Sequence, residues 1–164
     1  MTYLQKCIKC NKITNILCAI YGVYLLLLTT GMVLIFLMFD HLIGNESTGS
    51  AFVEFIRAIT CVLSALILVI GIIFAMAGIV YIILCVTGHK ANKHESINGL
   101  LGNSICKALV SATASICNHS ILTGSSADTD TISLIIALAN FLMTLSITIL
   151  ASYQIYAITK PEKD

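Results

Sequence analysis

The fold of this chain is decided by residues 58–88, which read AITCVLSALILVIGIIFAMAGIVYIILCVTG. The stretch carries no charged side chain between Arg57 at one end and His89-Lys90 at the other. About 20 apolar residues are enough to cross a hydrocarbon core of about 30 Å as a helix, so this run can span with tilt or project beyond the bilayer. The sequence therefore predicts an integral membrane protein.

The composition points the same way. Of the 164 residues, 58% are hydrophobic and 10% are charged, whereas soluble domains carry about 25% charged residues. The net charge of +1 and the absence of a basic run argue against a nucleic-acid partner. Pro161 is the single proline, so no proline interrupts the apolar runs. We predict one all-α membrane domain over residues 1–164.

The predicted spans cover about residues 14–39, 58–87, 98–122 and 132–158. The third is the most polar, but its apolar residues recur at three- and four-residue steps, which indicates an amphipathic helix. They are Ile97, Leu101, Ile105, Leu109, Ala112 and Ile116. This helix either spans the membrane with its polar side against other helices, or lies in the interface.

The distribution of Lys and Arg distinguishes the two topologies, because short cytoplasmic loops are enriched in these residues. With four spans and both termini inside, the lysines outside the spans all become cytoplasmic, and Arg57 alone lies outside. With three spans, Lys160 and Lys163 move outside while Asp128 and Asp130 move inside. We therefore predict an integral membrane four-helix bundle whose amino and carboxyl termini are cytoplasmic.

Lys107 is the formally charged residue inside a predicted span. A charge at mid-bilayer costs about 2.5–3.5 kcal/mol on insertion scales, so such a residue is a functional candidate by default. Because Lys107 lies near the inner end of its span, we favour a side chain that snorkels to the headgroups. The alternatives are pairing with a partner protein and an ion or anion pathway that also uses Asn103 and Ser111 on the same polar side.

Several residues are candidates for covalent modification. Cys7 and Cys10 form a C-x-x-C, but no second pair or histidine follows at the spacing of a metal site. Cysteines beside a membrane are candidates for S-palmitoylation, with unmodified thiols as the alternative. The acylation candidates are Cys7, Cys10, Cys18 and Cys85. Asn45 and Asn118 begin Asn-x-Ser sequons on predicted outer segments and are glycosylation candidates.

Two spans carry residues typical of helix contacts in membranes. Small residues let helix backbones approach closely, and Asn or Thr side chains hydrogen-bond between helices. Gly71, Ala75 and Gly78 form such a stripe in the second span, and Asn140 and Thr144 belong to one in the last span. We predict that these stripes face other helices; a pore or lipid cleft lined by Asn140 and Thr144 is the alternative.

No enzyme motif is present. The chain lacks G-x-S-x-G, H-E-x-x-H and the phosphate-binding G-x-x-x-x-G-K-[ST], and no span holds a pair of carboxylates. The four histidines fall at span ends, where they fit no metal-site template. We therefore predict a protein without catalytic residues, cofactor or metal.

The amino-terminal stretch resembles the start of a tetraspanin. The resemblance rests on residues 7–12 (CIKCNK), with a Lys-Cys pair before the first span, then on Asn15, Gly22 and Gly31 in the apolar run. It implies four spans, cytoplasmic termini, acylated juxtamembrane cysteines and a lateral organising role. The chain departs from the family in lacking Cys-Cys-Gly, and residues 118–131 are too few for the large disulfide-bonded outer loop.

These observations predict a non-enzymatic multi-pass membrane protein, a lateral organiser or accessory subunit that binds other integral membrane proteins. Self-association and contacts with membrane lipids belong to the same prediction, and a plasma or secretory-pathway membrane is favoured over an organellar one. The first alternative is a small oligomeric channel or transporter lined by the polar face of residues 98–122. The second is an accessory subunit of a large membrane complex.

Overall fold

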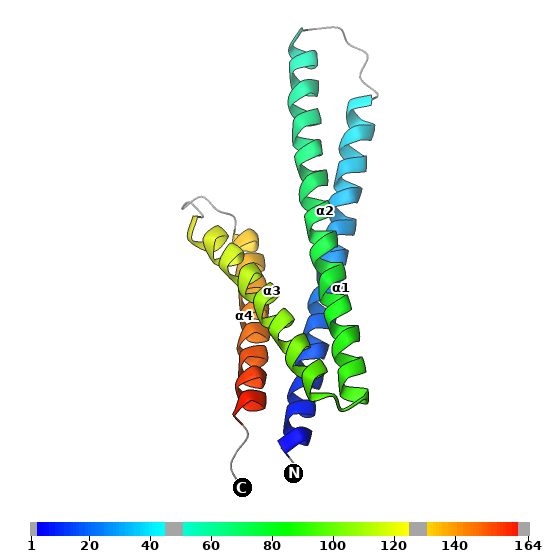
Figure 1. The fold of residues 1–164 in the computed structure, drawn as a ribbon. Helices are drawn as coiled ribbons and strands as arrows, with labels where there is room; N and C mark the ends of the chain where they lie inside the picture. The colour runs from blue at the N-terminus through cyan, green and yellow to red at the C-terminus, as the bar shows by residue number, and fades with distance from the viewer. Residues whose placement is uncertain (1–2, 45–50, 125–130, 161–164) are drawn as a thin grey trace. The chain divides into compact units, whose positions relative to one another are not determined.

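The computed structural model describes residues 3–44, 51–124 and 131–160, and every element in these ranges is helical. Four helices follow one another: α1 (Tyr3–Gly44), α2 (Ala51–Lys93), α3 (Ile97–Gly124) and α4 (Thr131–Thr159) (Figure 1). The shortest, α3, has 28 residues and is about 42 Å long at 1.5 Å per residue, which exceeds a hydrocarbon core of about 30 Å. Each helix is long and apolar enough to cross a membrane.

Helices α1 and α2 extend beyond the predicted spans. α1 already begins at Tyr3, inside the lysine-rich lead, because residues 3–21 contain neither Gly nor Pro to end a helix. α2 continues to Lys93, through the basic segment expected to be a turn. The first two predicted spans are thus the apolar parts of longer helices.

A three-residue connection, residues 94–96, joins α2 to α3. Glu95 has a φ of 49°, and Ser96 donates its backbone N–H to the Ala91 carbonyl, which together form the left-handed ending known as a Schellman motif. Ser96 then caps α3, since its hydroxyl accepts the N–H of Gly99 at 3.2 Å. The turn holds the end of α2 beside the start of α3.

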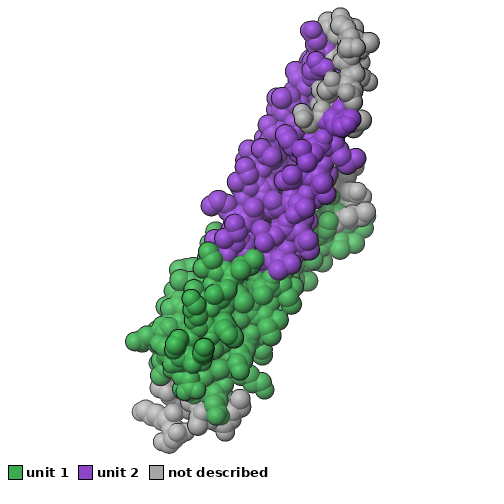
Figure 2. Space-filling model, turned by 90° about the vertical axis from the view of Figure 1, so that its right-hand side faces the viewer, with its two compact units in different colours: residues 1–21, 81–164 green, residues 22–80 purple. Residues whose placement is uncertain are grey.

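The described chain divides into two compact units. The long helices α1 and α2 contribute residues to both of them. Unit 1 comprises residues 1–21 and 81–164, and unit 2 comprises residues 22–80 (Figure 2). Unit 1 therefore holds the first part of α1, the last part of α2, and the whole of α3 and α4. Unit 2 is a pair of helices, the remainder of α1 and α2.

In unit 2, glycines of α2 lie against α1. A Cβ added at Gly78 would stand 3.0 Å from the Gly22 carbonyl oxygen, and one added at Gly71 would stand 3.6 Å from the Met32 Cβ. The Thr29 hydroxyl also donates to the Gly71 carbonyl at 3.2 Å. Close backbone approach at small residues, joined by a hydroxyl bond, is how helices associate where lipid removes the hydrophobic driving force.

Unit 1 turns the polar side of α3 inward. Along this helix the buried side chains are mostly polar, whereas Leu109 and Ile116 of the apolar stripe are 65% and 68% exposed. The buried polar residues of α3 are Asn103, Ser104, Lys107, Ser111 and Ser115. This orientation belongs to the first of the two expected arrangements, in which the polar side of residues 97–122 faces other helices.

Candidate functional site

Lys107 is the centre of a polar cluster inside unit 1. Its side chain is completely buried. The ammonium donates one hydrogen bond to Asn11 Oδ1 at 2.8 Å and another to Asn15 Oδ1, both on α1. The expectation that Lys107 snorkels to the headgroups is therefore wrong. The polar side of α3 faces α1, whose two asparagines supply acceptors that a snorkelling side chain would seek in water.

Amide groups connect this lysine to α2. Asn11 donates from Nδ2 to the Gly88 carbonyl at 3.0 Å and to Asn92 Oδ1 at 2.9 Å. Asn103 donates to the Leu84 carbonyl at 3.0 Å and to the Thr87 hydroxyl at 2.8 Å. Three helices therefore meet through side-chain amides, and each amide also bonds backbone or side chain of α2.

Gly88 makes this meeting possible. A Cβ at this position would stand 2.7 Å from Asn103 Oδ1 and closer still to Asn15 Oδ1. Real Cβ atoms do not approach that closely, so any side chain at residue 88 would displace both amides. The glycine is required here by packing, because its φ is negative and an ordinary residue could adopt the same backbone.

The hydrogen-bond acceptors of Lys107 in the described part of the chain are polar but uncharged. Both are neutral amide oxygens. A buried ammonium without a carboxylate partner is costly unless its donors are satisfied, and two strong acceptors satisfy two of its three. Within the described ranges, Asn103 Oδ1 and Asn92 Nδ2 stay without a hydrogen-bond partner.

The last helix joins the cluster through hydroxyl groups. Thr148 donates to the Ser111 hydroxyl at 2.9 Å, and Ser111 in turn donates to the Lys107 carbonyl at 2.5 Å. Thr144 is fully buried, and its hydroxyl donates a hydrogen bond to the Asn140 carbonyl of its own helix. Asn140 is half-buried, and its Oδ1 has no partner among the described residues.

The modification candidates lie in different environments. Cys7 and Cys18 are buried, whereas Cys10 and Cys85 are half-buried, so burial favours the latter pair for acylation. Asn118 lies inside α3 and is half-buried, and Asn45 lies outside the described residues. Over the described part of the chain, no group of three His, Cys, Asp or Glu residues could hold a metal ion. Acylation and glycosylation stay predictions.

Sequence reasoning missed the partners of Lys107. Asn11 and Asn15 are four residues apart, which places them on one face of a helix, and that spacing was the available signal. Asn92 lies beside Asn11 because α2 continues farther than the sequence predicted. Gln154 of α4 is a polar residue in an apolar run, and the sequence analysis did not single it out. The site therefore uses residues just outside the predicted spans as much as those inside.

Comparison of the chain with protein-family models, with curated proteins and with solved structures finds no match.

Proposed function

We propose that this protein is a non-enzymatic multi-pass membrane protein that binds other integral membrane proteins laterally, as an organiser or accessory subunit. The observation that carries the proposal is the inside-out arrangement of unit 1. Its buried polar side chains hydrogen-bond to one another, and large apolar side chains of α3 and α4 are exposed between the helix ends, among them Ile105, Leu109, Ile116 and Ile149. The surface offered to other molecules within the bilayer is therefore made of helix faces.

Outward-facing hydroxyls support the same conclusion. Thr60, Thr113 and Ser146 each donate to a carbonyl one turn earlier in their own helix, at 2.7–3.0 Å. Such bonds satisfy the hydroxyl locally, so these residues present no unmet donor to a solute. A pore-lining surface would instead keep polar groups available to water and ions.

The orientation in this proposal has both termini cytoplasmic, with four spans. The lysines of the amino-terminal lead, of the last turn of α2 and of the carboxyl-terminal end then share one side, as the positive-inside rule favours. The tetraspanin resemblance of residues 7–31 supports a lateral role in a plasma or secretory-pathway membrane. It contributes no binding loop, so the helices themselves are the contact surfaces.

Photo-crosslinking in the native membrane tests the proposal. A leucine-sized diazirine residue is placed at Leu66 or Leu109, which are 55% and 65% exposed, with Leu100 and Ile147, both fully buried, as matched controls. We expect crosslinks to one membrane protein, or to a second copy, from at least one exposed position and none from the buried ones. Crosslinks to lipid alone from every exposed position tried would refute lateral binding.

A flux measurement separates this proposal from the channel alternative. The purified protein is reconstituted in liposomes, and K⁺ and Cl⁻ release is compared with that of Lys107→Ala. We expect no release above empty liposomes for either protein. Conductance that disappears in the Lys107 variant would overturn the proposal and establish a pathway along the polar side of α3.

A further inference from the structure

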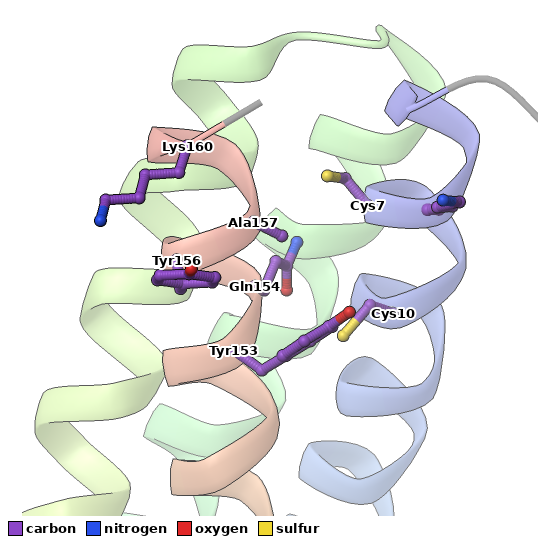
Figure 3. A pocket seen from close by; sticks show the side chains of 8 residues that line it. Cys7, Cys10, Tyr153, Gln154, Tyr156, Ala157 and Lys160 are labelled. Carbon is purple, nitrogen blue, oxygen red and sulfur yellow. The ribbon is translucent and has the colours of Figure 1, made fainter. Parts of the chain in front are cut away.

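A small cavity lies between the first turns of α1 and the last turns of α4, within unit 1. Its volume is about 130 Å³, far more than the 10–15 Å³ that one water needs on the same measure. Cys7 and Cys10 contribute from α1, and Tyr153 and Gln154 contribute from α4. In Figure 3, the Gln154 amide reaches from α4 into the space toward which both thiols point.

Gln154 is the unusual member of this lining. The side chain is fully buried, and neither its amide nitrogen nor its amide oxygen has a hydrogen-bond partner. Buried amides are nearly always paired, because leaving one unpaired forfeits its bonds to water without replacement. A donor and an acceptor thus point into a cavity and call for a ligand that offers the complementary groups.

Two lysines make the cavity attractive to anions. Lys6 of α1 and Lys160 of α4 both line it and are both exposed. Lys160 lies over the Tyr156 ring, 5.7 Å from its centroid, a weak contact that a flexible side chain can exchange for a phosphate. No carboxylate lines the cavity among residues 3–160 that the structure describes.

We propose that this cavity binds the phosphate monoester headgroup of an anionic membrane lipid. The two lysines would neutralise the phosphate, and Gln154 would donate from Nε2 to one of its oxygens. A monoester also carries a hydroxyl part of the time near neutral pH, because its second pKa is about 6. That hydroxyl can donate to Gln154 Oε1, which a phosphodiester lacks the proton to do.

The surroundings favour a lipid as the source of the phosphate. Lys6 and Lys160 line the cavity, and Lys9 and Lys12 are exposed farther along α1. Basic pockets between membrane helices on the cytoplasmic side suit anionic headgroups. Tyr153 and Tyr156 are about 60% exposed beside the cavity, and tyrosines favour the membrane–water interface. The inference rests on the proposed orientation but not on lateral binding of another protein.

Lipid binding to the purified full-length protein in detergent tests the inference. Short-chain phosphatidic acid is titrated while the thermal unfolding midpoint and, by native mass spectrometry, the number of bound lipids are recorded. Phosphatidylglycerol serves as the anionic diester, phosphatidylcholine as the zwitterionic diester, and inorganic phosphate as the free anion. We expect phosphatidic acid to bind most tightly and to raise the midpoint most.

Matched charge variants decide whether the cavity is responsible. Lys6→Gln with Lys160→Gln, and separately Gln154→Leu, should each weaken phosphatidic acid binding by about tenfold or more, since each removes charge-assisted hydrogen bonds. Lys9→Gln with Lys12→Gln removes the same charge from exposed lysines that do not line the cavity. That pair should change the affinity by less than about twofold.

Other outcomes would overturn the inference. Equal losses of phosphatidic acid affinity in the two double-lysine variants would indicate general attraction of anions to a basic surface rather than binding in the cavity. Equal binding of phosphatidylglycerol would remove the role given to the monoester hydroxyl, and equal binding of inorganic phosphate would identify a free-anion site. Because crosslinking to a membrane protein is read separately, failure here leaves the proposed lateral function to stand or fall on its own experiment.

Discussion

The hydrogen bond between Lys107 and Asn15 should be measurable as a coupling free energy. Asn15→Ala removes one of the two acceptors of a fully buried ammonium. Lys107→Met keeps the length of the side chain but removes the charge, and it leaves both asparagine oxygens without their donor. The double variant removes the interaction and its unmet partner together, so it should be less destabilised than the two single variants predict.

The expected magnitude follows from two opposing considerations. Hydrogen bonds to charged groups contribute about 1.5–3 kcal/mol in soluble proteins. Bonds between helices in a membrane average about 0.6 kcal/mol and reach about 1.7, because the unfolded chain in the membrane also finds partners. The Lys107–Asn15 bond is charged and completely enclosed, which places it toward the upper end. We expect a coupling of about 1–2 kcal/mol.

The free energy of unfolding is measured by reversible titration with a denaturing detergent in mixed micelles. Cys106→Ala is the control, because Cys106 is adjacent to Lys107 but exposed, and it should change stability by no more than about 0.5 kcal/mol. Additivity of Asn15→Ala and Lys107→Met within about 0.5 kcal/mol would refute the buried contact. It would show that the ammonium finds its partners elsewhere.

Three further substitutions test close approach and backbone strain. Gly88→Ala should lower the unfolding free energy by more than about 1 kcal/mol, whereas Gly102→Ala, which has nothing within 4 Å, should not; equal effects would contradict the packing at residue 88. Gly78→Ala should push α1 away from α2 in unit 2 and lower the unfolding free energy. Gly31→Ala is the control, because a Cβ at residue 31 would have nothing within 4 Å. Equal changes in the unfolding free energy for the two variants would contradict the close approach at residue 78. Glu95→Gly should stabilise by about 0.5–1 kcal/mol because residue 95 is left-handed, and a loss measured in the same detergent titration would contradict the turn geometry.

Most of the helical organisation could be predicted from apolar length alone. Residues 58–88 carry an unbroken apolar run, and the run before it and the last one are equally clear, so three of the four helices follow from apolar length. The third, α3, is more polar, and the three- and four-residue spacing of its apolar side chains predicted it. The ends of the helices could not be placed this way. Nothing in a hydropathy pattern distinguishes the end of a span from the end of a helix, and α1 and α2 both continue past the apolar run.

The site was predictable only in part, for a geometric reason. Asn103, Lys107 and Ser111 share a face by their spacing, so their gathering on one side of α3 follows from sequence. Which helix covers that side depends on rotation and depth, and these are set by contacts such as that of Gly88 with two asparagines. The burial of Lys107 therefore depends on acceptors in another helix. Its position near the end of its own span had favoured a side chain that snorkels to the headgroups, which is wrong.

The two units use different means to hold helices together, and the difference has a physical reason. Unit 2 pairs two helices through glycine contacts and through the hydrogen bond that the Thr29 hydroxyl donates to the Gly71 carbonyl. Unit 1 brings parts of four helices together, and in lipid the hydrophobic effect cannot specify which faces should meet. A polar interior can specify which faces meet, because each amide reaches its hydrogen-bond partner only at one rotation and one depth of its helix. The hydrogen bonds of Lys107 and of the amides around it thus join α1, α2 and α3, and they require a lysine that is buried rather than one that contacts the headgroups.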